Sequence, residues 1–192
     1  LSRIWKRIYI ERLGELLIYN IVSLFYLLFC SFVKKIEYDL VPRNPYAFGV
    51  NLAFQNAAQE KLKKILIIEF GVASGGGLFN LAYIASRLSK IYNIDYEVIG
   101  FDTGKGMPPP IDYKDHPEKY RTGDFPSLGL SENKLPKKTK IYYGEIEETV
   151  NLIKNYNTKD VKIGFVAVDV DYYTSTVSCL KSLRFEQSMY LS

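Results

Sequence analysis

Two carboxylates stand two residues apart late in the chain, at Asp169 and Asp171. An apolar run over 164–168 precedes them and predicts a buried strand that ends where the pair begins. Residues two apart on a strand share a face, and close carboxylates need a cation, a proton or hydrogen bonds between them. Two interpretations stay open. Either the pair holds a hard divalent cation such as Mg²⁺, or Asp171 caps the next helix while Asp169 positions a cofactor or the backbone.

A glycine-rich turn carries a second group of candidate residues. The apolar run 65–68 leads into Glu69 and then into glycines at 71, 75, 76 and 77, which allow a sharp turn and a close approach to a ligand. Apolar residues at helical spacing follow directly: Leu78, Leu81, Ala82, Ala85 and Leu88. Strand, turn and helix start together predict the corner at which α/β sheets bind nucleotides.

The spacing of this turn indicates which nucleotide it suits. The pattern Glu69-x-Gly71-x-x-x-Gly75 differs from the G-x-G-x-x-G of dinucleotide folds, and an acid at the strand end disfavours a diphosphate. The next apolar run, 96–101, ends at Asp102, where a carboxylate can accept hydrogen bonds from both hydroxyls of a ribose. The turn and the two acids therefore predict a site for an adenosine that carries a cationic amino-acid tail.

Four stretches, in this order, resemble class I S-adenosylmethionine-dependent methyltransferases, and more closely the macrocin O-methyltransferase-like branch with its bacterial relatives. They lie at 68–75, at 100–110, at 115–120 with 123–126, and at 163–176. The resemblance runs from about residue 46 to about residue 183. It implies an α/β, Rossmann-like, doubly wound and mostly parallel sheet. It also implies S-adenosylmethionine as cofactor, metal assistance, and a small-molecule methyl acceptor such as a sugar or a glycosylated metabolite.

The same resemblance assigns residues to the cofactor. The candidates are Glu69, Gly71, Ala73, Ser74, Gly75, Asp102 and Glu145. Glu145 follows a third predicted strand at 140–143 and is placed to accept from the adenine amino group. An ordinary acid at a helix start is the equally open alternative for this residue.

Asp169 and His116 are the candidate catalytic residues. His116 is the only histidine, and its near-neutral pKa suits a general base, although most histidines in surface loops are simply solvated. It lies in a stretch from 103 to 130 that is rich in proline, glycine and charge. Long loops of this kind often cover binding sites, so we expect this one to cover the cofactor and to shape the acceptor site.

The amino-terminal part carries all of the formal net charge. Residues 1–35 contain six basic and two acidic groups, which equals the +4 of the whole chain. The remainder is neutral, which argues against nucleic acid as a partner. Within this part, residues 16–33 form an uncharged run of a length at the short end for a membrane span. We expect this run either to associate with a membrane, spanning or peripheral, or to pack as a helix on the domain or on a second subunit.

Prolines at 42 and 45 predict a linker, so we divide the chain into an apolar helical extension (1–44) and a methyltransferase-like domain (45–192), with a helix over 47–62. The family sheet has seven strands, and this sequence provides four and one more helix. We therefore expect a sheet truncated after strand four, in a partial sequence or a truncated gene product that begins with Leu1. That last strand would be an exposed edge. Two distant cysteines indicate neither a disulfide framework nor a zinc site.

Three functions follow from these features. The first is a cytoplasmic S-adenosylmethionine-dependent O-methyltransferase, membrane-associated if residues 16–33 bind lipid. The second is a catalytically incompetent remnant that serves as a membrane-associated or oligomerising module. The third is an NAD-dependent oxidoreductase, which Glu69 and the glycine spacing disfavour.

Overall fold

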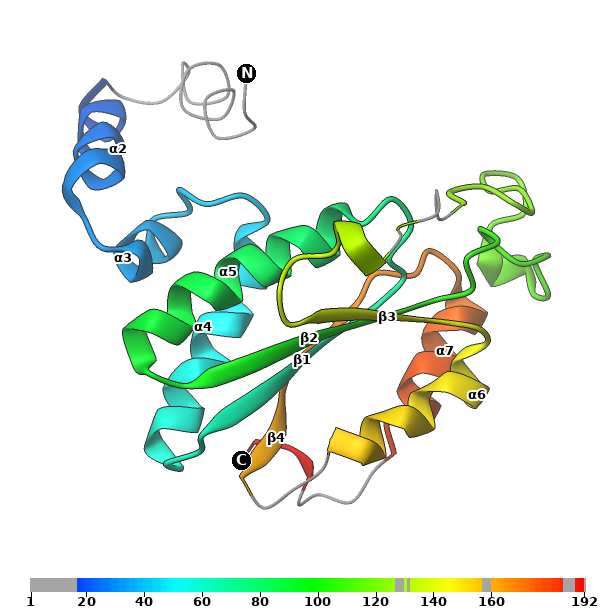
Figure 1. Cartoon of the computed structure of the whole chain (residues 1–192). Helices are drawn as coiled ribbons and strands as arrows, with labels where there is room; N and C mark the ends of the chain where they lie inside the picture. The colour runs from blue at the N-terminus through cyan, green and yellow to red at the C-terminus, as the bar shows by residue number, and fades with distance from the viewer. Residues whose placement is uncertain (1–16, 127–129, 131, 157–159, 185–188, 192) are drawn as a thin grey trace.

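A computed structural model describes residues 17–126, 130, 132–156, 160–184 and 189–191. They form a parallel sheet between two layers of helices (Figure 1). The strands are β1 (Lys64–Phe70), β2 (Asp95–Asp102), β3 (Thr139–Tyr143) and β4 (Val161–Val168), in the order β3-β2-β1-β4. All three pairings are parallel. The predicted α/β, Rossmann-like fold is therefore confirmed.

Each face of the sheet carries its own hydrophobic core. Helices α4 (Asn44–Gln59) and α5 (Gly76–Tyr92) cover one face, and α6 (Ile146–Thr149), the 3₁₀ helix η4 (Val150–Tyr156) and α7 (Tyr173–Ser182) cover the other. On β1, Ile65 and Ile67 belong to the first core, whereas Leu66 and Ile68 belong to the second. Both faces are buried, which is why the sequence of β1 is continuously apolar instead of alternating. Two short 3₁₀ helices, η2 (Tyr113–Asp115) and η3 (Glu132–Lys134), lie in the connection from β2 to β3.

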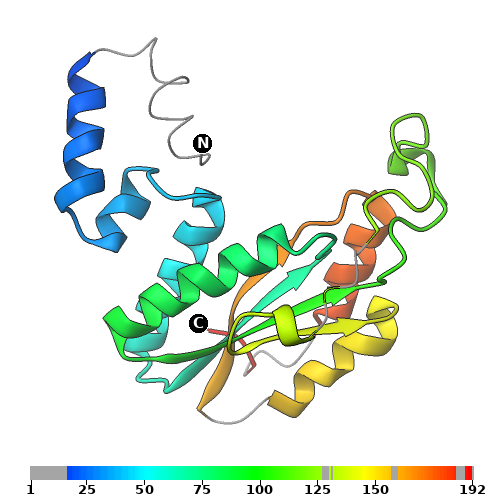
Figure 2. The same ribbon diagram turned by 45° about the horizontal axis from the view of Figure 1, so that its top comes forward.

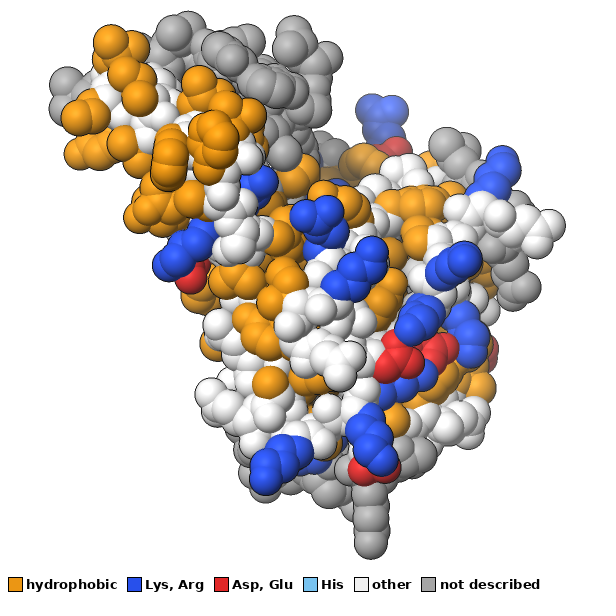
Figure 3. Space-filling view, turned by 60° about the vertical axis from the view of Figure 1, so that its left-hand side comes forward, with side chains coloured by type: hydrophobic (Ala, Val, Ile, Leu, Met, Phe, Trp, Pro, Cys, Tyr) orange, Lys and Arg blue, Asp and Glu red, His pale blue; other side chains and the backbone are white. Residues whose placement is uncertain are grey.

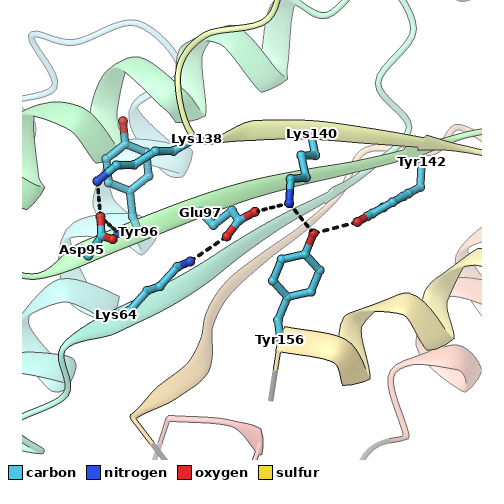
Figure 4. A network of polar contacts seen from close by, with 8 residues as sticks. All are labelled: Lys64, Asp95, Tyr96, Glu97, Lys138, Lys140, Tyr142 and Tyr156. Carbon is cyan, nitrogen blue, oxygen red and sulfur yellow. Dashed lines mark hydrogen bonds and ion pairs between the residues drawn. The ribbon is translucent and has the colours of Figure 1, made fainter. Parts of the chain in front are cut away.

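A polar network joins three strands and η4 (Figure 4). Glu97 of β2 accepts from Lys64 Nζ of β1 at 2.6 Å and pairs with Lys140 Nζ of β3 at 3.0 Å. Lys140 also donates to the Tyr156 hydroxyl at 3.0 Å, and this hydroxyl lies 2.6 Å from that of Tyr142. Burial alone would raise the pKa of Glu97, but the two lysines lower it. These side chains therefore stabilise the sheet by pairing its charges.

The segment before α4 differs from the predicted linker. Helix α4 begins at Asn44, three residues before the predicted start, with Pro45 in its first turn. Proline is favoured there because the first backbone N–H groups of a helix have no partner inside it. A short helix, α3 (Phe32–Glu37), precedes α4, and Phe32, Ile36 and Val41 are buried in the core that α4 and α5 share. Part of the extension predicted over 1–44 therefore packs with the domain.

The uncharged run of residues 16–33 is not one helix. Helix α2 (Leu17–Phe29) ends before Cys30, and α3 begins at Phe32 after Ser31, whose hydroxyl accepts from the Lys34 backbone N–H at 3.4 Å. Leu16 lies outside the described residues. Both ribbon views show α2 away from the sheet, beyond α3 (Figures 1 and 2). Within the described ranges, no helix is both long and apolar enough to cross a membrane.

Strand β4 lies at one edge of the sheet, as expected. A short pairing covers part of that edge: Tyr190 forms a parallel bridge with Ile163, and the Leu191 N–H donates to the Ile163 carbonyl at 3.2 Å. Met189, the residue before this bridge, is buried in the second core. The end of the described chain therefore packs against the start of β4.

Candidate functional site

A cavity of about 560 Å³ opens at the carboxyl ends of the strands. Its walls come from the loops after β1, β2 and β4, from the stretch 106–111, and from the starts of α6 and α7. This is the edge of an open parallel sheet at which ligands bind, because the loops there diverge on either side of neighbouring strands. Of the predicted cofactor residues, Gly71, Ala73, Ser74, Asp102 and Glu145 line the cavity.

The glycine turn brings the ends of β1 and β4 together. Gly71 has a φ of +86°, and a Cβ atom there would overlap the carbonyl oxygen of Asp169. The Gly71 N–H donates to the Phe101 carbonyl at 2.9 Å, and the Asp169 N–H donates to the Phe70 carbonyl at 2.9 Å. Only glycine combines this φ with so close an approach. Gly75, with a φ of +86°, is the N-cap of α5 and does not line the cavity.

Asp102 holds the glycine turn in place. Its Oδ2 accepts from the N–H groups of Val72 and Ala73 at 2.8 and 2.9 Å, and its Oδ1 accepts from the Gly104 N–H at 2.7 Å. These bonds occupy most of what a carboxylate can accept. The two ribose hydrogen bonds predicted for Asp102 would have to share the same oxygens. Bracing the turn is thus a second role for this residue, one that the sequence did not indicate.

Glu69 lies behind the turn instead of in the cavity. It is fully buried, and neither carboxyl oxygen has a hydrogen-bond partner among the described residues. A Cβ atom at Gly77, in the first turn of α5, would overlap Oε1 of Glu69. Burial raises the pKa of Glu69 to about 8, with a further contribution from the Asp169 carboxylate, whereas Arg43 opposes the shift. Glu69 does not line the cavity, so this position gives no support to the cofactor contact predicted for it.

Asp169 is held by two side chains from the start of α4. Its Oδ2 accepts from the Tyr46 hydroxyl at 2.9 Å and from Arg43 Nη1 at 3.2 Å. The Arg43 guanidinium also lies 5.4 Å from the centre of the Tyr46 ring. Burial, the Glu69 charge and the bond to Asp169 raise the pKa of Tyr46, so the phenol remains a donor. Arg43 and Asp169 line the cavity, and the Asp169 side chain is 51% exposed.

Arg43 and Tyr46 were not predicted, because Arg43 lies in the predicted linker and Tyr46 lies between that linker and the helix predicted over 47–62. The signal that marks them is the Asn44-Pro45 pair, which is typical of a first helical turn and not only of a helix break. No sequence pattern pairs Arg43 with a carboxylate 126 residues away.

Asp171 also lines the cavity, so both members of the carboxylate pair reach it. Within the described part of the chain, no group of three or more His, Cys, Asp or Glu side chains is arranged to hold a metal ion. Arg43 and Tyr46 moreover occupy Oδ2 of Asp169. The Mg²⁺ site predicted for Asp169 and Asp171 therefore finds no support in this geometry.

His116 lies on the surface of the loop after β2. Its ring is exposed, Nδ1 is 2.9 Å from Oε1 of Glu118, and it is not one of the described residues that line the cavity. This position therefore gives no support to the catalytic role predicted for His116.

Its neighbour Asp115 instead forms the buried hydrogen bonds that hold this loop. Asp115 is fully buried and accepts from the N–H groups of Ile111, Asp112 and Thr174 at 2.9–3.1 Å, and from the Thr174 hydroxyl. Burial would raise the pKa of Asp115, but these bonds lower it to about 2. Ile111 and Thr174 both line the cavity, so Asp115 ties one wall to another. The sequence signal was the capping-box spacing of Asp112 and Asp115.

Comparison with known proteins supports the fold. No protein-family model matches the sequence, and no curated protein is significantly similar to it. The chain is similar to the crystal structure of CalS11, a calicheamicin methyltransferase, with 19% identity and a TM-score of 0.50 over 86% of this chain and 71% of that chain. The apo structure of CalS11, described as a TDP-rhamnose 3'-O-methyltransferase of calicheamicin biosynthesis, gives a TM-score of 0.40 at the same identity and coverage. At this identity the likeness extends to the fold, and the macrocin O-methyltransferase-like branch is not confirmed.

Proposed function

We propose that this chain binds S-adenosylmethionine in the cavity and transfers its methyl group to a hydroxyl of a small molecule. The observation that carries the proposal is the cavity at the carboxyl ends of the strands, where the turn after β1, Asp102 after β2 and Asp169 after β4 face one space. Its volume of about 560 Å³ lies in the range of small-molecule sites.

The charge of the lining suits a cationic cofactor. Four carboxylates face the cavity, from Asp102, Glu145, Asp169 and Asp171, and Arg43 is the single guanidinium in the described lining. A sulfonium with an amino-acid tail is stabilised in such surroundings, whereas a dinucleotide would bring a diphosphate towards several negative charges. The backbone of the turn 71–74, the remaining acceptor capacity of Asp102, and Glu145 are the groups we propose to hold the cofactor.

Asp169 is the residue we propose to accept the proton. When bound, the cofactor would supply an electrophilic methyl group. As the new C–O bond formed, the methyl–sulfur bond would break to leave the neutral thioether, and the acceptor hydroxyl would lose its proton to Asp169. Arg43 and Tyr46 fix the Asp169 carboxylate through Oδ2 and leave Oδ1 for the acceptor. General-base catalysis requires such a carboxylate within hydrogen-bond reach of the hydroxyl. A magnesium-assisted reaction is the alternative for the same residue.

The acceptor side of the cavity has both apolar and hydroxyl-bearing walls. Met107, Pro108, Ile111 and Phe125 line one part of it, and Thr174, Ser175 and Ser178 line another. A molecule with several hydroxyls on a carbon frame makes use of both kinds of wall, because its ring packs on apolar atoms while its hydroxyls bond to the serines and the threonine. A sugar or a glycosylated metabolite is therefore our proposed acceptor class.

Calorimetric titration with S-adenosylhomocysteine, with NADH as control, tests the cofactor. We expect saturable binding of S-adenosylhomocysteine at one site and no binding of NADH. A folded chain that binds neither compound would overturn the proposal and favour the inactive remnant, and binding of NADH alone would favour an oxidoreductase.

The same titration with and without Mg²⁺ separates the two roles of Asp169. If Asp169 is a metal-independent base, Mg²⁺ leaves the affinity and the melting temperature unchanged in the parent and in Asp169→Asn. A Mg²⁺ response in the parent that Asp169→Asn abolishes would support the metal-assisted alternative. Asp160→Asn, at an exposed position outside the cavity lining, is the control.

A further inference from the structure

Helix α2 exposes an apolar face. The exposed side chains are Leu17, Ile18, Tyr19, Ile21, Val22, Leu24, Phe25, Leu28 and Phe29. At 100° per residue all of them except Tyr19 fall on one broad side of the helix. Figure 3 shows apolar side chains gathered at one end of the molecule, beside the grey residues. A contiguous apolar surface of this kind marks an interaction site.

The opposite side of α2 is covered except at Tyr19, which is exposed. Ser23 is buried, and Tyr26 packs on Tyr38, with ring centres 3.9 Å apart and a hydrogen bond of 2.9 Å between the hydroxyls. A surface helix of a soluble domain normally buries its apolar stripe and exposes its polar one. Helix α2 reverses this arrangement, so its exposed side requires a partner that is itself apolar.

We propose that α2 lies in the surface of an anionic lipid bilayer, with this face in the boundary between headgroups and acyl chains. At 1.5 Å per residue the 13 described residues of α2 span about 20 Å, less than the roughly 30 Å of a hydrocarbon core. The described part of the helix is therefore too short to cross the core, which suits a position in the interface. The chain turns at Cys30 and Ser31, which carries α3 and the domain away from the helix.

Charge favours an anionic lipid surface over a second copy of this chain. Helix α2 carries no charge, whereas four basic residues (Arg3, Lys6, Arg7 and Arg12) and two acidic ones (Glu11 and Glu15) precede it in the sequence, and Lys34 and Lys35 follow it. The rest of the chain, 36–192, has as many acidic as basic groups. A second copy would bring the same positive excess to the interface, but anionic headgroups attract it. The exposed ion pair between Lys34 and Glu37, at 2.6 Å, adds little stability and leaves Lys34 able to contact lipid phosphate.

Vesicle flotation of the full chain tests the proposal. Vesicles of phosphatidylcholine with phosphatidylglycerol are compared with vesicles of phosphatidylcholine alone. The double substitution Phe25→Glu with Leu28→Glu places two charges on the exposed face of α2. Phe48→Glu with Leu180→Glu is the matched control, because these side chains are 54% and 58% exposed, compared with 56% and 60% for Phe25 and Leu28. Circular dichroism and melting temperature check that both variants fold.

We expect the parent and the control to float with the anionic vesicles, and the α2 variant to bind them at least about tenfold more weakly. Binding to the neutral vesicles should be about tenfold weaker for the parent as well, and added salt should weaken binding to the anionic ones. Equal flotation of both variants, or none by the parent, would overturn the proposal. So would a lipid-independent dimer in light scattering that the α2 substitutions convert to monomer, because a second copy would then cover the face.

Discussion

The carboxyl group of Glu69 is fully buried behind the glycine turn, without a hydrogen-bond partner among the described residues. An ionised carboxylate in such a place is costly, and the charge of Asp169 adds to the cost. The resulting pKa of about 8 lies above that of a carboxyl group in an unfolded chain. In the unliganded protein, therefore, folding itself favours the protonated form of Glu69.

This shift predicts how the stability of the unliganded protein depends on pH. Between about pH 4.5 and pH 8 the folded state binds more protons than the unfolded state, so stability is full below this window and falls as pH rises through it. Glu69→Gln removes the effect. In urea unfolding, we expect the free energy of unfolding of Glu69→Gln to rise relative to that of the parent from pH 5 to pH 8, by at most about 1.4 kcal/mol per pH unit. Glu145→Gln, at an exposed position, should show no such trend. A gap between Glu69→Gln and the parent that stays constant with pH would contradict the burial of Glu69.

At the scale of elements, β1 and α5 pack closely where the Glu69 carboxyl lies against the first turn of the helix. Gly76→Ala and Gly77→Ala make a matched pair in the first turn of α5. A Cβ atom at Gly77 overlaps the Glu69 carboxyl, whereas one at Gly76 meets nothing nearer than Arg43 Nη2 at 3.8 Å. We expect Gly77→Ala to lower the free energy of unfolding by about 1–3 kcal/mol, because the Glu69 carboxyl must shift and is fully buried among other groups. Gly76→Ala should be neutral or stabilising by up to about 1 kcal/mol. Equal effects in chemical denaturation would show that the overlap is relieved without cost.

The loop after β2 is joined to the start of α7 by Asp115. Asp115→Asn should lower the free energy of unfolding at pH 7 by about 1–3 kcal/mol, because an amide cannot accept all four hydrogen bonds. The folded pKa of about 2 lies below the unfolded value, so this stability is present above about pH 4 and is lost as pH falls towards 2. The difference between parent and variant, measured by denaturation, should shrink over that range. Asp160→Asn is the control at an exposed site, and a difference independent of pH would contradict the assignment.

The elements that carry the site were predictable because their signals are local. The strand, glycine turn and helix over 65–88 lie side by side in the sequence, and each leaves its own pattern of apolar residues or glycines. The same holds for Asp102 and Asp169 at the ends of strands. Side-chain direction was not predictable in this way: Glu69, at the end of β1, points behind the turn because Gly77 leaves room for it there.

At the scale of the whole molecule, the parts that sequence could not give are contacts between distant segments. Arg43 and Tyr46 meet Asp169 across more than 120 residues, and Asp115 meets Thr174 across 59. Such pairs produce no periodic pattern in the sequence from which they could be predicted. The packing of residues 32–41 with the domain was not predictable for the same reason. The burial of Phe32, Ile36 and Val41 depends on where α3 packs against α4 and α5.

That packing predicts two different outcomes of shortening the chain. A chain that begins at Cys30 keeps Ser31, the cap of α3, and loses only α2 and what precedes it, so we expect a melting temperature within a few degrees of the parent. A chain that begins at Pro42 loses four buried side chains: Phe32, Ile36, Leu40 and Val41. At about 1.5–3 kcal/mol for each, this loss is comparable to the whole stability of a domain, so the shorter chain should be largely unfolded.

Circular dichroism and thermal denaturation of the two shortened chains measure the difference, and titration with S-adenosylhomocysteine shows whether the first keeps its cavity. If both chains melt like the parent, the folded unit begins near residue 45, as the prolines at 42 and 45 suggested. If only the first does, the unit begins at α3, and α2 and the residues before it are not needed for folding. The exposed apolar helix would then be an addition that the fold does not need, which is what a lipid-binding role requires.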